Sequence, residues 1–411
     1  MLRPVSPGLA STSATPDGIN LTGPEGLLRL VPGTQAQRKA HADPELRPRL
    51  GLNFALQDYL GLALHPAVRS AALGALGQHR LVAPGTAPRQ GLTESVHVLE
   101  DNIAAFLRLP AAVTFPSGDQ AIRLTLCALL RAGDDVIVDS GAHPAMFETV
   151  SLTQAHLHRS PSGSVDGVER RLSRLSRQPR KGRLFIAVPA ISAHGSKMAD
   201  LAELSALARQ HKATLVADVT HDLGAMGPSG GGVMEIQACL SRVDIVLGSL
   251  AKTFGASGGF AAFRDPALKA VLHQSQWRTT ALSPVNAAAI LAALEVISTA
   301  EGRRRRRNLH GLSLRLRNHL MADGVKVMGQ ASPFVPILLP TLSALPRTAL
   351  LESAGPLVTL LQAPSVPAHT PRWRIQLTAD HSPADIDDLA ELIRDVSRAF
   401  DRAPARQRVP A

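Results

Sequence analysis

Short apolar runs alternate with helical patterns between residues 52 and 284, and this alternation restricts the fold more than any other feature of the chain. Apolar runs of this length are typical of strands covered on both faces, and intervening helices allow such strands to run parallel. The sequence therefore predicts an α/β fold with a mainly parallel sheet covered by helices. We expect strands at residues 112–115, 135–138, 184–188, 214–217, 244–247 and 259–263, and helices among them at residues 96–107 and 201–211.

Composition divides the chain into an arm and two domains. Its 411 residues, 45% of them hydrophobic, can bury a large core but are too many for one ordinary domain. Residues 1–50 are rich in proline, glycine and polar groups and are expected to form a loosely ordered arm that folds against a partner subunit. Residues 51–284 form the predicted large domain. Residues 285–411, with a long helix, a few strands and an amphipathic helix at 383–400, form a smaller α+β domain.

Cysteine content and hydropathy favour a cytoplasmic protein without a metal site. The two cysteines, Cys127 and Cys239, have no paired spacing, so neither a disulfide framework nor a zinc site is indicated. No stretch approaches the roughly 18 consecutive apolar residues that cross a bilayer. The proline-rich start also lacks the basic and apolar regions of a secretory signal. We therefore expect no membrane association and a reducing environment.

The formal net charge of +11 raises the question of an acidic partner. Nucleic acid is not expected, because aromatic residues make up 3% of the chain and no helix-turn-helix, zinc or RNA-binding signature is present. Acidic acyl carrier proteins or the phosphates of coenzyme A suit a basic surface better, since complementary charge speeds encounter. The arginine run at residues 303–307 is interpreted as the solvated face of the long helix that links the domains.

Lys252 is the strongest candidate for a catalytic residue. It lies in the segment SLAKTFGASGGF, residues 249–260, whose small side chains let a flat phosphorylated ring approach the backbone. A desolvated lysine has a lowered pKa and readily forms an imine with an aldehyde. Asp218 ends the apolar run 213–217, and a carboxylate there can reach the pyridinium nitrogen of pyridoxal 5'-phosphate (PLP), which makes the ring an electron sink. A lysine on a loop surface is the alternative for Lys252 alone.

Other candidates follow predicted strands in the same way. Ser117 and Gly118 precede a helical stretch at 121–130, where unpaired amides favour a phosphate, although an ordinary serine cap has the same pattern. His143 follows the strand 135–138 and can lie flat on a ring bound at the strand ends, or be merely solvated. His221 is close enough to Asp218 to hydrogen-bond the phenolic oxygen of the same cofactor, or is a structural histidine.

Two arginines alternate in the run RWRIQL. Period two places Arg372 and Arg374 on one face of a strand, where one guanidinium can fork onto a substrate carboxylate. Arg374 is favoured for that role, and Arg372 fits a solvated arginine on an edge strand better.

Seven motifs in one collinear order, between about residues 53 and 392, resemble those of the alpha-oxoamine synthases. The segments are NFALQDYLGLALHPAVRSAALGAL from Asn53, PSGDQAIRLTLCALL from Pro116, DSGAHPAMFETV from Asp139, DVTHDLGAMGPSGGG from Asp218, SLAKTFGASGG from Ser249, WRTTALSP from Trp277 and SVPAHTPRWRIQLTADHSPADID from Ser365. The resemblance implies a fold type I PLP-dependent transferase. It also implies an acyltransferase activity that joins an amino acid to an acyl thioester, with loss of carbon dioxide, to give an alpha-amino ketone.

The resemblance also implies a role for each matching residue. Lys252 holds the cofactor and acts as base, His143 stacks on its ring, Asp218 contacts its nitrogen and His221 its phenolic oxygen. The expected phosphate contacts are Ser117, Gly118, Asp119, Ser249 and, across the interface of a homodimer with shared active sites, Thr279 or Thr280. Arg374 and Asn53 are expected to bind the substrate.

Some positions depart from the family pattern. Asp119 stands where an aromatic residue is usual, Pro189 where a glutamate is usual, and residues 193–196 match a Ser-Met-Asp-Gly segment only loosely. These positions lie where the substrates would be held, so they indicate a specialised biosynthetic branch rather than biotin, haem, threonine or sphingolipid metabolism. The amino acid, the acyl group and the choice between coenzyme A and a carrier protein remain open.

Three other functions were weighed against the same sequence features. A fold type I aminotransferase or decarboxylase would employ the same lysine and aspartate but consume no thioester. A non-catalytic partner subunit would lack the lysine, and Lys252 is present. A PLP-binding transcription regulator would need an N-terminal DNA-binding domain, which 50 proline-rich residues do not supply.

Overall fold

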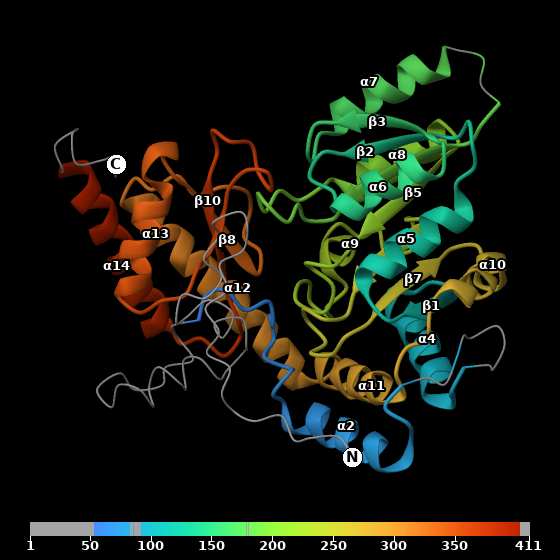
Figure 1. Ribbon diagram of the computed structural model, residues 1–411, viewed down its shortest axis with the longest axis horizontal. Coiled ribbons are helices and arrows are strands. Elements are labelled where there is room, and N and C mark those ends of the chain that lie inside the picture. The colour runs from blue at the N-terminus through green and yellow to red at the C-terminus, as the bar shows by residue number, and fades with distance from the viewer. Residues whose placement is uncertain (1–52, 83–84, 86–91, 178, 180, 403–411) are drawn as a thin grey trace, which may run out of the picture. The chain divides into compact units, whose positions relative to one another are not determined.

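The computed structural model describes residues 53–82, 85, 92–177, 179 and 181–402 (Figure 1). Residues Phe54–Ala411 form one compact unit, and Met1–Asn53 belong to another. The predicted arm at residues 1–50 lies outside the described residues, and the predicted domain boundary at residue 284 stays a prediction.

The larger sheet is mainly parallel, as predicted. Its seven strands follow the order β1-β7-β6-β5-β4-β2-β3, and β7 alone runs antiparallel to its neighbours β1 and β6. The strands are β1 (Ala111–Phe115), β2 (Asp135–Asp139), β3 (His156–Ser160), β4 (Leu184–Pro189), β5 (Ala213–Asp218), β6 (Ile245–Ser249) and β7 (Gly259–Phe263). The edge strand β3 was missed, because its sequence HLHRS is polar and only Ser160 among its five residues is buried.

Helices cover both faces of this sheet. In β2, Val136 and Val138 pack into one apolar core and Ile137 into the other, as the period of two requires. One core includes α5 (Gly118–Leu129), α6 (Pro144–Leu152) and α10 (Ala267–Ser275). The other includes α2 (Pro66–Gln78), α4 (Glu94–Leu107), α7 (Val165–Ser176), α8 (Leu201–Gln210), α9 (Gly232–Ile236) and α11 (Pro284–Ser298).

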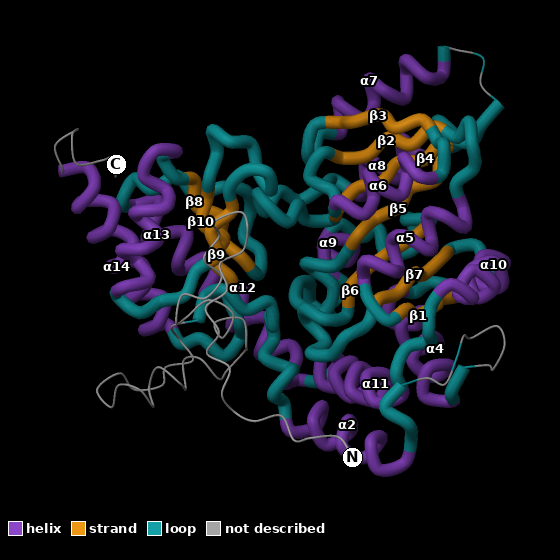
Figure 2. The backbone as a smooth tube through the Cα atoms, viewed as in Figure 1, coloured by secondary structure: helices purple, strands orange, loops and turns teal. Residues whose placement is uncertain are grey.

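A three-stranded antiparallel sheet follows later in the chain, in the order β8-β10-β9 (Figure 2). Its strands are β8 (Phe334–Leu338), β9 (Thr359–Leu361) and β10 (Arg372–Gln376), accompanied by helices α12 (Ala300–Ala322), α13 (Ala344–Ser353) and α14 (Pro383–Arg402). Because β10 is the central strand, the interpretation of Arg372 as a solvated edge-strand residue was wrong. Its side chain is buried and donates hydrogen bonds to Thr370 and to the carbonyl of His194.

The predicted long helix after residue 285 is two helices. α11 ends at Ser298, Thr299 is extended, and α12 starts at Ala300, with an angle of 78° between the two helices. A Cβ at Gly302 would lie 2.3 Å from the carbonyl oxygen of Ile297, so only glycine allows the start of α12 to pack this closely against the end of α11.

The described helices were also compared with the length and hydropathy of a membrane span. No single one of them meets both requirements, whereas α11 and α12 meet them only when they are counted together across their bend.

Candidate active site

The predicted site residues gather at the carboxyl ends of the parallel strands. Asp218 is the last residue of β5 and Ser249 the last of β6, Ser117 follows β1, and His143 follows β2. In open α/β sheets, ligands bind at this edge of the sheet. The fold therefore brings together side chains that are more than 100 positions apart in sequence, as the family resemblance implies.

The turn before α5 forms a cradle for a phosphate. Ser117 Oγ accepts a hydrogen bond from the Gln120 amide at 3.2 Å, and the helix begins at Gly118, three residues earlier than the sequence pattern suggested. Within the described residues, the amides of Gly118 and Asp119 have no acceptor. Unpaired amides at a helix N-terminus favour an anion. The serine is thus an N-cap, and this role leaves two amides for a phosphate.

Glycine keeps this cradle open. A Cβ at Gly118 would lie 2.6 Å from the Cβ of Ser249, and one at Gly259 would lie 2.2 Å from the carbonyl oxygen of Ser117. The close approach of the turn to the end of β6 and the start of β7 therefore requires both glycines.

The Asp119 carboxylate is held by an ion pair with the next turn of α5. Arg123 donates to Asp119 at 2.7 Å and to Glu148 on α6 at 2.7 Å. Because the carboxylate is neutralised by this arginine, its charge opposes a phosphate at the turn less than the sequence suggested. The backbone amide of Asp119 is the group that remains open to a phosphate, and this contact stays a prediction.

Lys252 is the end of a buried chain of hydrogen bonds. Its Nζ lies 3.1 Å from His221 Nε2, and His221 Nδ1 lies 2.8 Å from the hydroxyl oxygen of Tyr59. Tyr59 is completely buried, and its backbone amide donates to the carbonyl oxygen of Lys252 at 3.1 Å. The lysine is thus fixed at both its backbone and its amino group.

The charges around Lys252 explain its protonation. Burial, reinforced by the nearby Arg374 and opposed by Asp218, lowers the pKa of Lys252 from 10.5 to about 8. Burial, with Lys252 and Arg374, lowers the pKa of His221 well below 6.5, so this imidazole is neutral. A neutral ring that accepts from the lysine ammonium at Nε2 carries its proton on Nδ1 and donates it to Tyr59.

Asp218 is the buried carboxyl group that is predicted to contact the ring nitrogen of the cofactor. Its side chain is 7% exposed, and one carboxylate oxygen accepts a hydrogen bond from the amide of Thr220 at 3.0 Å. The nearby Asp222 is fully buried, and burial together with the charge of Asp218 raises the pKa of Asp222 to about 8. Burial thus favours the protonated form of Asp222 at neutral pH, and the contact of Asp218 with a ring nitrogen stays a prediction.

Arg374 reaches the site from β10. It donates to the carbonyl of Ala193, in the segment that follows β4, at 3.3 Å. Its Nε is buried and has no acceptor within the described part of the chain. An unpaired buried donor of this kind is costly, and an incoming carboxylate would satisfy it.

Two histidines lie near these cations. His143 caps α6, where its Nδ1 accepts from the amide of Ala145 at 3.2 Å, and its side chain is exposed. His194 occupies the loosely matching segment after β4. Its pKa is lowered by burial first and then by the charges of Arg374, Arg372 and His143. The site thus concentrates positive groups, which suits anionic ligands.

Thr279, Thr280 and Asn53 are the remaining predicted site residues. Thr279 Oγ1 donates to Gln120 on α5 of its own chain at 3.0 Å, so it lies beside the phosphate turn. Thr280 follows it, and contact of either with a partner subunit stays a prediction. Asn53 is the last residue of the N-terminal unit, and its contact with substrate also stays a prediction.

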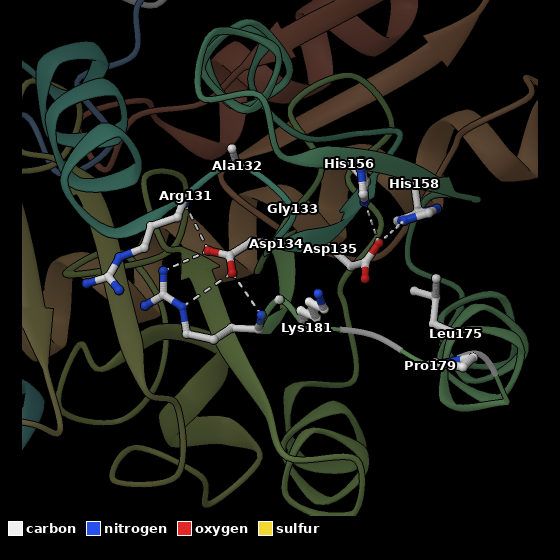
Figure 3. A pocket seen from close by; sticks show the side chains of 12 residues that line it. Arg131, Ala132, Gly133, Asp134, Asp135, His156, His158, Leu175, Pro179 and Lys181 are labelled. Carbon is white, nitrogen blue, oxygen red and sulfur yellow. Dashed lines mark hydrogen bonds and ion pairs between the residues drawn. The ribbon is translucent and has the colours of Figure 1, made fainter.

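A separate polar pocket of 570 Å³ lies at the opposite ends of β2, β3 and β4 (Figure 3). Arg183 pairs with Asp134 at 2.7 Å, and His158 with Asp135 at 2.8 Å. Its buried carboxylates are already satisfied by these partners. Within the described residues, no group of three or more His, Cys, Asp or Glu side chains could hold a metal ion.

A profile of the family described as aminotransferase class I and II matches residues 51–393. The chain belongs to this family. It is 32% identical to an 8-amino-7-oxononanoate synthase of Marinobacter nauticus over 87% of this chain and 90% of that protein. It is also 32% identical to the enzyme of the same name from Saccharophagus degradans, over 84% of this chain and 87% of that protein.

Solved structures show the same fold. Serine palmitoyltransferase from S. paucimobilis, with a bound PLP-myriocin aldimine, superposes with a TM-score of 0.79 at 24% identity, over 84% of this chain and 87% of that one. The Sphingomonas wittichii serine palmitoyltransferase gives a TM-score of 0.79 at 24% identity, over 86% and 88%. These findings confirm the predicted alpha-oxoamine synthase family, its fold, its PLP cofactor and its reaction class.

Sequence reasoning gave no role to Tyr59 and did not select His194 as a site residue. Tyr59 is the only tyrosine of the chain and lies inside the first family motif, which could have marked it. His194 had no such signal, because its segment matches the family poorly and only the fold places it beside Arg374.

Proposed function

We propose that this protein uses PLP to condense an amino acid with an acyl thioester, releasing carbon dioxide and a thiol and leaving an alpha-amino ketone. The partly buried Lys252 carries this proposal, because it combines a lowered pKa with a hydrogen bond to His221, nearby Asp218 and the unpaired donor of Arg374.

The residues present fit PLP. The open amides of Gly118 and Asp119 and the hydroxyl of Ser249 would hold the phosphate, Lys252 the aldehyde and Asp218 the ring nitrogen. His221 would contact the phenolic oxygen and His143 the ring face. Once bound, PLP supplies an electron sink that stabilises negative charge on the substrate Cα.

Lys252 and Arg374 act on the amino acid. The Arg374 guanidinium binds its carboxylate, which orients the Cα toward Lys252. An amine with a pKa of about 8 is partly unprotonated near neutral pH, so Lys252 can take the Cα proton. His143 assists at the thioester carbonyl. Its side chain is exposed at the start of α6, so an incoming thioester can reach it.

The wider assignment covers assembly, location, the acyl donor and the pathway. The protein acts as a homodimer in which Thr279 or Thr280 completes the phosphate site of the partner, and it works in the cytoplasm. The basic surface receives either coenzyme A or an acidic carrier protein. Because Asp119, Pro189 and His194 differ from the family pattern around the substrates, the product belongs to a specialised biosynthetic branch.

The decisive experiment records the visible spectrum of the purified protein with PLP while a panel of amino acids is added. We expect a bound-cofactor band that one amino acid shifts and that Lys252→Ala abolishes or alters. Absence of any band with excess PLP would contradict the enzyme assignment and favour a non-catalytic partner subunit.

The responsive amino acid is then supplied with acyl-coenzyme A or acyl carrier protein of varied chain length. Release of free thiol together with carbon dioxide, in equal amounts, supports the condensation. An oxo acid or an amine formed without thioester consumption would instead indicate an aminotransferase or a decarboxylase.

A further inference from the structure

A second cavity, of 840 Å³, lies apart from the residues assigned to the PLP site. It is open to solvent on one side and is lined by α12, by the loop that precedes α9 and by residues 330–333 before β8. Much of its wall is apolar, and these side chains come from Met198, Met226, Ile236, Leu309 and Pro333. A cavity of this size and lining suits a ligand with a substantial apolar part.

One wall of the cavity is cationic. Arg303, Arg306, Arg307 and His310 line it from α12, at spacings of three and four residues that place them on one face of the helix. Among the described residues, no aspartate or glutamate lines the cavity. The arginine run is therefore not simply a solvated helix face, as the sequence suggested, because part of it borders an apolar cavity.

The partners of these arginines differ according to the side of the helix. Arg304 and Arg305 face Glu301 at 3.8 Å and 3.0 Å, and Arg305 also pairs with Asp380. By contrast, neither Arg303 nor Arg307 has a carboxylate within 4.0 Å in the described part of the chain. Arg303 and Arg307 are exposed and have no carboxylate partner in the described ranges, whereas the charge of the buried Arg306 is partly offset by the nearby Glu235.

Arg306 adds a buried, unpaired donor. Its side chain is 5% exposed and donates to the carbonyls of Ile297 and Pro228, at 2.8 Å and 2.9 Å. Its Nε is buried and has no acceptor within the described residues. A buried guanidinium nitrogen without an acceptor carries a desolvation cost that an anion in the cavity would reduce.

We propose that this cavity binds a linear acyl chain that ends in a carboxylate. The chain lies along the apolar wall, and the carboxylate lies against Arg303 and Arg307. Burial of the chain supplies the hydrophobic gain, and the carboxylate offsets the like charges that repel one another along α12. This site is additional to the proposed condensation and does not depend on it.

The test uses the full chain and dodecanoate as probe, with affinity measured by calorimetry. Dodecanoate should bind, whereas dodecyltrimethylammonium and dodecanol should bind much more weakly. Arg303→Gln combined with Arg307→Gln should weaken dodecanoate binding about tenfold or more, since charge-assisted contacts to both are lost. Arg304→Gln, an exposed change on the same helix outside the cavity, is the matched control and should bind as the wild type.

Two further variants locate the ligand. Ile236→Glu places a negative charge on the apolar wall at a residue that is 53% exposed, and it should weaken binding without unfolding the protein. Lys252→Ala should bind dodecanoate as the wild type does, because the cavity is separate from the PLP site.

The proposal is overturned by any of four results. These are equal binding to the double variant and the wild type, equal binding of the cationic amphiphile, loss of binding in Lys252→Ala, and no binding of dodecanoate to the full chain. The last result would mean that the cavity does not take a ligand of this class.

Discussion

At the scale of single residues, the site depends on how Tyr59 and His221 hold the amino group of Lys252. The imidazole lies between a phenol at 2.8 Å and an amine at 3.1 Å, and both partners are remote from it in sequence. Because His221 is neutral, each ring nitrogen has a single role: Nε2 accepts from the lysine ammonium, and Nδ1 donates to the phenol, which holds the ring in place. Tyr59 is therefore a positioning residue.

Tyr59→Phe should lower the free energy of unfolding by about 1–3 kcal/mol, because the buried Nδ1 of His221 is left without a partner. Urea denaturation of the cofactor-free protein measures this change. Wild-type protein should also show no tyrosinate absorbance at about pH 11, since burial raises the pKa of this single tyrosine above the ordinary value of about 10. Ionisation at the ordinary pH would show that the phenol is not buried against His221.

Lys252 should make stability depend on alkaline pH. Its folded-state pKa of about 8 lies below the unfolded value of 10.5, so the unfolded chain binds more protons between these values and stability rises with pH there. Below pH 8 the buried ammonium costs up to about 3 kcal/mol. Lys252→Met should therefore raise the free energy of unfolding of the cofactor-free protein at pH 7.

The gain from Lys252→Met should disappear as pH approaches 10.5. Lys326→Met, at an exposed position, is the control for loss of one lysine. A gain that is the same at pH 7 and pH 10.5 would mean that the variant acts through packing rather than through the lysine charge.

At the scale of elements, the corner between α11 and α12 decides how the chain passes from one sheet to the other. The extended Thr299 ends the first helix, and Gly302 lets the second begin against the carbonyls of Val296 and Ile297. The bend also gives Arg306 its buried position, where it donates to Ile297 and Pro228. The sequence predicted a single long helix here, and this bend was not visible in it.

Gly302→Ala should destabilise the protein by roughly 1–3 kcal/mol, because the added Cβ would overlap backbone atoms that cannot easily move. Gly311→Ala lies in the same helix with no atom within 4 Å of its Cβ, so it should instead stabilise by about 0.5–1 kcal/mol. Urea denaturation of the two variants provides the comparison. Similar effects of both would argue against a tight corner at Gly302.

At the scale of the whole molecule, the predicted homodimer has a specific consequence. If Thr279 or Thr280 completes the phosphate site of the partner, Lys252→Ala and a Thr279→Ala, Thr280→Ala double variant are defective in different halves of a shared site. Co-expression of the two inactive variants should restore up to about a quarter of wild-type activity. With random pairing, about half of the dimers contain one chain of each variant, and one of the two sites in each such dimer is intact.

The mixed dimers are compared with each variant alone, and sedimentation should give a mass near twice the 43.4 kDa of the chain. A mixture as inactive as its parents, with dimers present, would place the threonines in the same site as their own Lys252, beside Gln120.

Much of the fold and of the site was predictable because local patterns carry it. Strand β7 was predicted at its exact bounds, and the other apolar strands within one or two residues, since each is a short buried run between turn residues. Lys252, Asp218 and Ser117 were identifiable because their neighbours are small or polar where a strand ends. The polar strand β3 and the buried Arg372 were missed, because their positions depend on neighbouring strands rather than on their own sequence.

The sequence by itself determined the α/β class and the family, because periodicity and collinear motifs are properties of the chain, and it selected the residues that are proposed to hold PLP. Only the tertiary structure decided that His221 joins Tyr59 to Lys252, that Arg374 keeps an unpaired donor and that part of the arginine run lines an apolar cavity. These features arise from contacts between distant segments, and burial then changes the pKa and the hydrogen-bonding needs of side chains in ways that no local pattern records.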